Sequence, residues 1–243
     1  MELESKVALV TGAGRRLGRA IAAALAGRGM TIALHHHNSA KGAEQLRSEI
    51  LAKGGTAERF PADLTDPQAC VDLPKQVIER FGRLDVLINS AAVMKRLSVE
   101  ETTPVEWDEI MHLNLRACFF CLQGALPALR ASKGKVVNIA DVGGIEPWPR
   151  YVAHCTSKAG VIMLTKALAR ALAPDITVNA VAPGAVLPPE DWSETTRAHI
   201  TKTTPLRRLG TPADVAAAML YLLEGGDYVT GETIVVDGGR LIR

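Results

Sequence analysis

Short apolar runs rich in β-branched residues alternate along the chain with longer stretches in which apolar residues recur at helical spacing. This alternation is typical of parallel strands joined by helices that cover both faces of the sheet. Seven runs predict strands, at residues 6–12, 30–36, 56–62, 84–90, 135–141, 176–182 and 232–238. Helical patterns lie between them, near residues 16–28, 40–53, 67–81, 104–131, 151–173 and 212–223. The pattern therefore predicts an α/β fold, a single Rossmann-type domain over residues 1–243 with a doubly wound, seven-stranded parallel sheet.

The longest stretch without a clear pattern is residues 183–210, PGAVLPPEDWSETTRAHITKTTPLRRLG. It follows a predicted strand at its carboxyl end, where open α/β sheets bind their ligands. Long excursions at this edge are typical of substrate lids, so we expect a lid over about residues 184–210. Glu190, Asp191 and Trp192 are its candidate substrate contacts, since an indole can stack on a planar ring.

Composition narrows the class of protein. Of the 243 residues, 47% are hydrophobic but only 4% aromatic, which suits the aliphatic core of a parallel sheet. A net charge of +2 gives no indication of binding to nucleic acid or to an anionic membrane. The first residues, MELESKVALVTG, lack the basic region of a signal peptide, and no apolar run is long enough to span a bilayer. We therefore expect a cytoplasmic protein.

The four cysteines are Cys70, Cys118, Cys121 and Cys155, which we expect to be reduced thiols. Cys118 and Cys121 form a CxxC motif, but it lies in an apolar helical pattern and no second pair completes a zinc site. Three adjacent histidines at 35–37 cannot readily converge on one ion, because neighbouring strand residues point to opposite faces. The sequence therefore predicts no metal site.

A cofactor site is indicated at the end of the first predicted strand, where TGAGRRLG (11–18) runs directly into a helix. Glycines at such a turn let the backbone approach a pyrophosphate, and the helix N-terminus supplies N–H donors. The second strand ends in HHHNS (35–39), without the acidic residue that binds the ribose hydroxyls of NAD, while Arg15 and Arg16 lie on the facing turn. This combination favours a 2′-phosphate, and thus NADP(H).

These features resemble the short-chain dehydrogenase/reductase family over nearly the whole chain. The resemblance also includes NSAA (89–92), Pro183-Gly184 and the C-terminal VTGETIVVDGG (229–239). It implies the following cofactor-binding residues: Gly12, Gly14, Arg15, Arg16, Leu17, Gly18, His36, His37, Asn38, Ser39, Asp63, Leu64, Asn89, Ala91, Lys158, Pro183 and Gly184. It implies that Lys158 holds the nicotinamide ribose and that Asn114 anchors a water that feeds protons to this lysine. With the apolar surface of helix 151–173, it also implies a homotetramer, with a dimer as second choice.

At two positions where the sequence departs from the family pattern, its residues resemble those of pteridine reductases. Arg16 replaces the middle glycine of the turn, and Asp141 replaces the usual catalytic serine. LHHHNSA (34–40), VNIAD (137–141) and PPEDW (188–192) are similar to that subgroup as well. The resemblance implies NADPH-dependent hydride transfer to a dihydropterin or a similar small C=N or C=O substrate. The aromatic residue that sandwiches the pterin in some of these enzymes would fall near Val93-Met94, where neither residue is aromatic.

The stretch YVAHCTSKAG (151–160) carries a third departure, because His154 occupies the position of the family's catalytic tyrosine, four residues before Lys158. Three interpretations remain open. His154 itself donates the proton, oriented by Asp141; or Tyr151 donates it, since positions 151, 154 and 158 share a helix face; or the site binds NADP(H) without turnover, as a sensor or partner subunit. A reductase of another small ketone or quinone would use the same residues.

Overall fold

A computed structural model of the chain describes residues 1–188 and 192–242. At its centre is a seven-stranded sheet in the order β3-β2-β1-β4-β5-β6-β7, in which every pair of neighbouring strands is parallel. The strands are β1 (Val7–Val10), β2 (Thr31–His36), β3 (Ala57–Pro61), β4 (Val86–Asn89), β5 (Lys135–Ile139), β6 (Thr177–Pro183) and β7 (Thr233–Val236). The predicted Rossmann-type α/β fold is confirmed.

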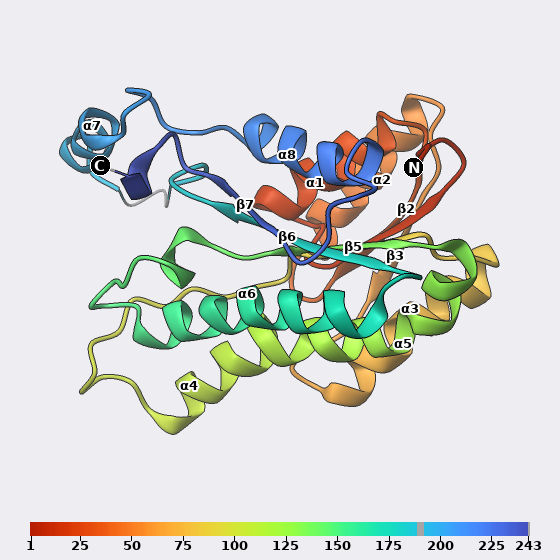
Figure 1. Cartoon of the computed structure of the whole chain (residues 1–243), viewed down its shortest axis with the longest axis horizontal. Coiled ribbons are helices and arrows are strands. Elements are labelled where there is room, and N and C mark those ends of the chain that lie inside the picture. The colour runs from red at the N-terminus through yellow and green to blue at the C-terminus, as the bar shows by residue number, and fades with distance from the viewer. Residues whose placement is uncertain (189–191, 243) are drawn as a thin grey trace.

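Helices cover both faces of this sheet (Figure 1). One layer, above the sheet in the view, holds α1 (Arg16–Ala26), α2 (Ala40–Ala52) and α8 (Pro212–Glu224). The other layer holds α3 (Pro67–Phe81), α4 (Pro104–Met111), α5 (Ala117–Ser132) and α6 (Val152–Leu172). Each layer has its own aliphatic core, one around Ile21 and Met219 and the other around Leu73 and Leu129. Within the described residues, no helix is both long and apolar enough to cross a membrane.

The order of the strands determines where the ligand site lies. Successive strands add outward from β1 to β3, and the chain then crosses back so that β4 pairs with the other side of β1. Parallel sheets bind ligands outside the carboxyl ends of the strands at such a switch point. Residues that follow β1, β4 and β5, such as Gly12, Ala91 and Asp141, therefore meet at one edge of the sheet.

The stretch 183–210 differs from the prediction, because it is not wholly irregular. Pro183 is the last residue of β6, and Glu194–Thr203 form a further helix, α7. The Ser193 hydroxyl caps α7 by accepting a hydrogen bond from the Thr196 N–H at 3.1 Å. No residue of α7 is buried, so the helix lacks the apolar periodicity by which a helix is recognised in a sequence. Glu190 and Asp191 lie outside the described residues.

Candidate active site

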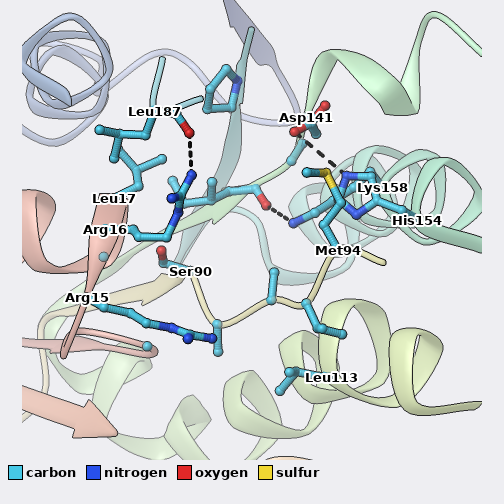
Figure 2. Close-up of a pocket in the computed structure, with 18 of the residues that line it drawn as sticks. Arg15, Arg16, Leu17, Ser90, Met94, Leu113, Asp141, His154, Lys158 and Leu187 are labelled. Carbon is cyan, nitrogen blue, oxygen red and sulfur yellow. Dashed lines mark hydrogen bonds and ion pairs between the residues drawn. The ribbon is translucent and has the colours of Figure 1, made fainter. Parts of the chain in front are cut away.

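A cavity of about 850 Å³ opens at the carboxyl edge of the sheet (Figure 2). Its volume lies in the range of small-molecule and cofactor sites. Its wall combines the turn after β1 with segments that follow β2, β3, β4, β5 and β6, and with the start of α6. The residues predicted from the sequence that line it are Gly12, Arg15, Arg16, Leu17, Gly18, His37, Asn38, Ser39, Asp63, Leu64, Ala91, Asp141, Tyr151, His154, Lys158, Pro183, Gly184 and Trp192.

Four other predicted site residues are buried and do not line the cavity: Gly14, His36, Asn89 and Asn114. His36 is buried at the end of β2. The side-chain amide of Asn89 donates to the Asn138 Oδ1 at 2.8 Å, which ties β4 to β5. These residues support the wall rather than form it.

Asn114 lies in a π-helical turn, His112–Arg116, that joins α4 to α5. Its side-chain amide donates to the Val93 carbonyl at 2.9 Å and to the Ser157 hydroxyl at 3.0 Å, and its Oδ1 accepts from the Val93 N–H at 2.8 Å. The Asn114 carbonyl accepts the Cys118 thiol, with the sulfur 3.3 Å away. Asn114 therefore fixes the loop after β4 and the start of α6 relative to each other.

The glycine-rich turn leaves room for a phosphate. Gly12 has a φ of +69°, and a Cβ there would lie 3.0 Å from the Cα of Ala91. A Cβ on Gly18 would lie 2.3 Å from the Gly12 carbonyl oxygen, which requires glycine for this close packing. Among residues 1–188 and 192–242, no side chain caps the start of α1, and no acidic residue lies in the first turn of this helix. The N-terminus of α1 can therefore bind an anion, and the turn fits the pyrophosphate of a dinucleotide.

Arg16 has an unusual backbone for a side chain of its size, with a φ of +49° in the left-handed region. Glycine adopts this backbone conformation without strain, as the resemblance in sequence led us to expect at this position. The Arg16 guanidinium donates to the carbonyl of Leu187, in the segment after β6 (Figure 2). Arg16 thereby connects two walls of the cavity.

The three adjacent histidines have three different environments. The Nδ1 of His35 accepts the Gly12 N–H at 2.9 Å, and its Nε2 lies 3.1 Å from the Ala62 carbonyl, so the proton of the neutral ring is on Nε2. Burial lowers the pKa of His35 to about 4. His36 is buried, whereas His37 lines the cavity with its Nδ1 4.0 Å from the Asp63 Oδ1. No role for His35 was evident from the sequence, because both of its partners are distant along the chain.

Asp63 is held close to this edge by its own turn. Its Oδ1 accepts the Thr65 N–H at 2.9 Å and the Thr65 hydroxyl at 2.7 Å, and these hydrogen bonds lower the pKa of the Asp63 carboxyl. Among residues 1–188 and 192–242, no group of three His, Cys, Asp or Glu side chains is placed to hold a metal ion.

His154 lies on the opposite side of the cavity from the turn. Its ring is buried, and neither ring nitrogen has a hydrogen-bond partner among the described residues. Its Nε2 is 3.8 Å from the Asp141 Oδ2 (Figure 2). The other carboxylate oxygen of Asp141 accepts the Gly143 N–H at 2.7 Å, so the backbone holds this carboxylate in place. The arrangement is an Asp–His pair facing the cavity.

Lys158 follows His154 by one helical turn on α6. Its Nζ donates to the Ile139 carbonyl at 2.7 Å, at the end of β5 (Figure 2). Burial lowers the pKa of Lys158. The ammonium group therefore has one donor anchored at the sheet edge and two others for a ligand in the cavity.

Tyr151 lies outside the helix that the sequence predicted to include it. With a φ of −140° and a ψ of 35°, it is the residue before α6, which starts at Val152. Tyr151 nevertheless lines the same cavity as His154 and Lys158, so its role as an alternative proton donor stays a prediction.

One aromatic residue on the cavity wall, Trp148, was not found by sequence reasoning. Its ring lies nearly parallel to that of His154, at an interplanar angle of 9° with centroids 6.3 Å apart. Its only signal in the sequence is its place between two prolines, in EPWPRY (146–151), directly before α6. Glu109, which accepts a hydrogen bond from Lys95 at 2.6 Å, and Arg240 also line the cavity without having been predicted.

Together, the sheet order, the glycine-rich turn and the lysine on α6 define a class of nucleotide-dependent oxidoreductases. The family model described as "Enoyl-(Acyl carrier protein) reductase" matches residues 12–240. The chain belongs to the short-chain dehydrogenase/reductase family.

The similarity to several named proteins covers nearly the full chain. A 3-oxoacyl-[acyl-carrier-protein] reductase of Staphylococcus aureus is 38% identical, with 97% of this chain and 98% of the relative covered. The versicolorin reductase of Emericella nidulans is 34% identical, with 98% and 96% covered. A solved structure of a putative short-chain alcohol dehydrogenase from Sinorhizobium meliloti is 31% identical with a TM-score of 0.93, covering 100% of this chain and 99% of the other. The general assignment as a reductase is supported, but these names do not indicate a pterin substrate.

Proposed function

We propose that this protein is an NADPH-dependent reductase in which His154 supplies the proton. The observation that carries this proposal is the Asp141–His154 pair at the cavity wall. The imidazole is buried, and both of its ring nitrogens are unpartnered among the described residues. A buried polar ring without hydrogen bonds is costly, so such a ring is retained where a ligand completes its contacts.

The residues present fit a nicotinamide dinucleotide phosphate. The turn after β1 and the uncapped start of α1 would hold the pyrophosphate. His37, Asn38 and Ser39 line the cavity after β2 and offer donors for a 2′-phosphate, with Arg15 on the facing turn. The carboxylate of Asp63, which also lines the cavity, already accepts two hydrogen bonds from Thr65. These contacts support NADP(H) over NAD(H).

When bound, NADPH supplies a hydride for the carbon of a C=O or C=N group. The chain must then deliver a proton to the heteroatom of that group, and the imidazole of His154 is a common type of general acid. Asp141 lies on the Nε2 side of the ring, with its Oδ2 3.8 Å from that nitrogen. Lys158, anchored to the Ile139 carbonyl, has donors left for the nicotinamide ribose. The product is the alcohol or amine.

The substrate that we propose is a small planar ring compound, with a dihydropterin as the first choice. Trp148, Tyr151 and Trp192 line the cavity, and aromatic walls favour flat ligands. The names of the relatives support a 3-oxoacyl thioester or a polycyclic ketone as the second candidate.

A protein that binds NADP(H) without turnover is the alternative of another class. It would have the same cofactor cavity, with His154 as a residue that has lost the family's chemistry. The cytoplasmic location and the homotetramer remain proposals too. Met163 on α6 and Phe119 on α5, which are 64% and 39% exposed, support a contact between subunits.

The test compares wild type with His154→Gln and His154→Tyr. NADPH oxidation is followed by its absorbance, with dihydrobiopterin, dihydrofolate, quinones, simple ketones and a 3-oxoacyl thioester, and NADPH binding is measured separately. We expect turnover by wild type and a loss of about 10²–10⁴-fold in kcat for His154→Gln, with equal NADPH affinity. Tight NADPH binding without turnover, together with activity gained in His154→Tyr, would instead establish the quiet binding protein.

A further inference from the structure

The ring of His154 lacks the hydrogen bond that usually orients a catalytic imidazole. Such rings are generally fixed by a bond from the nitrogen that does not react. Here neither the Nδ1 nor the Nε2 of His154 has a partner among the described residues, and the Asp141 Oδ2 is 3.8 Å away, beyond hydrogen-bonding distance. A different contact must therefore prevent rotation of the ring.

Trp148 makes that contact. The two rings are 9° from parallel with centroids 6.3 Å apart, within the range of offset stacking. The indole is itself held from its edge by the ring of Tyr151, at 77° and 5.9 Å. The Tyr151 N–H donates to the Trp148 carbonyl at 2.9 Å, which closes the turn before α6. The indole thus has a fixed position against which the imidazole can lie.

Gly143 makes room for this arrangement. A Cβ at position 143 would lie 3.0 Å from the Cζ3 of Trp148 and 3.1 Å from the Oδ1 of Asp141. The same backbone N–H of Gly143 holds that carboxylate oxygen at 2.7 Å. Because position 143 is a glycine, the Asp141 carboxylate and the Trp148 indole can both lie close to the His154 imidazole.

We propose that Trp148 is the positioning residue for His154, and that its indole face holds the imidazole with Nε2 turned toward Asp141 and away from water. The stack persists when the imidazole is protonated, because the negative face of an indole attracts a cation. This inference rests on the proposed function for its link to turnover, but the contact itself exists in the resting protein. Stacking on Trp148 thus orients His154, as a hydrogen bond orients other catalytic imidazoles.

The first test is made without substrate and uses fluorescence. An imidazolium that touches an indole quenches its emission by electron transfer, whereas a neutral imidazole does not. We expect acidification to lower the emission of wild type more than that of His154→Gln. Trp148→Phe and the double variant Trp148→Phe/His154→Gln should lose the same emission on acidification, because both retain Trp107 and Trp192 and neither has the indole that contacts His154. An equal difference in both backgrounds would overturn the proposal.

The second test separates positioning from simple packing. Trp148→Phe keeps a ring face, whereas Trp148→Leu keeps apolar bulk without one. We expect Trp148→Leu to lower kcat by about tenfold or more with unchanged NADPH affinity, and Trp148→Phe to retain most of the activity. Equal kcat values for wild type and Trp148→Leu would refute the positioning role.

The two proposals fail separately. Should no substrate be reduced while the fluorescence difference is present, the proposed reductase function fails and the positioning of His154 by Trp148 still stands. Should turnover occur without that difference, the reductase stands and the role of Trp148 is overturned.

Discussion

The buried imidazole of His35 makes the glycine-rich turn sensitive to acid. Its unprotonated Nδ1 accepts the Gly12 N–H at 2.9 Å, and its Nε2 faces the Ala62 carbonyl at 3.1 Å. A second proton would remove the acceptor and place a charge in a buried position. The turn that would hold the pyrophosphate therefore depends on a neutral His35.

The size of this effect follows from the two states of the chain. Burial lowers the pKa of His35 from 6.5 to about 4 in the folded protein. As the pH falls, the unfolded chain therefore binds the proton first, so the stabilisation is complete above about pH 6.5 and is lost as the pH falls through about 4. Linkage gives a loss of about 2 kcal/mol in the free energy of unfolding between pH 7 and pH 5, and of about 3 kcal/mol in all.

Urea unfolding of wild type and His35→Gln at pH 7 and pH 5 measures this loss. Glutamine keeps an acceptor for the Gly12 N–H but does not titrate in this range. The other titratable groups are present in both proteins, so the comparison isolates the replacement of His35. We expect wild type to lose about 2 kcal/mol more than the variant over this interval. Equal losses in the two proteins would refute the role assigned to His35.

Two further predictions concern the backbone of the cofactor turn. Gly14→Ala places a Cβ 2.2 Å from the Ser39 Oγ. We expect it to lower the free energy of unfolding in urea by about 1–3 kcal/mol and to weaken NADPH binding. Gly27→Ala, whose Cβ has ordinary contacts at 3.4 Å, should change neither quantity. Arg16→Gly should raise the free energy of unfolding by about 0.5–1 kcal/mol, because it relieves a φ of +49°, but it should weaken NADPH binding. Lys133→Gly, at the same φ but outside the cavity, should raise the free energy of unfolding without changing NADPH binding. Unchanged NADPH affinity in Arg16→Gly would contradict a cofactor role for this arginine.

The strands were predictable because both faces of the sheet are covered by helices, so most strand positions require apolar residues. Val7–Val10 and Lys135–Ile139 are buried throughout, so each appears in the sequence as a short, mostly apolar run. The helix Glu194–Thr203 was not predictable in the same way, because none of its residues is buried. Its start depends on the Ser193 cap, a local signal too common to indicate a helix without apolar periodicity.

The candidate site was predictable where chemistry depends on spacing along the chain. His154 and Lys158 share one helix, and the end of β5 brings Asp141 to them, as the sequence suggested. The roles of His35 and Trp148 were not predictable, because they depend on contacts with residues that only the fold brings near. The segment before α6 also bends at Tyr151, which spacing alone had placed on the helix.

Two histidines impose opposite demands on the proposed enzyme. His154 must carry a proton to donate it in the proposed reaction. His35 must stay neutral to hold the turn, and its pKa of about 4 places the loss of NADPH binding well into the acid range. The two effects are separable, because one changes kcat at constant NADPH affinity and the other changes affinity and stability together. In the proposed reaction, a protonated His154 and a neutral His35 therefore act at separate steps, the first in proton delivery and the second in holding the cofactor turn.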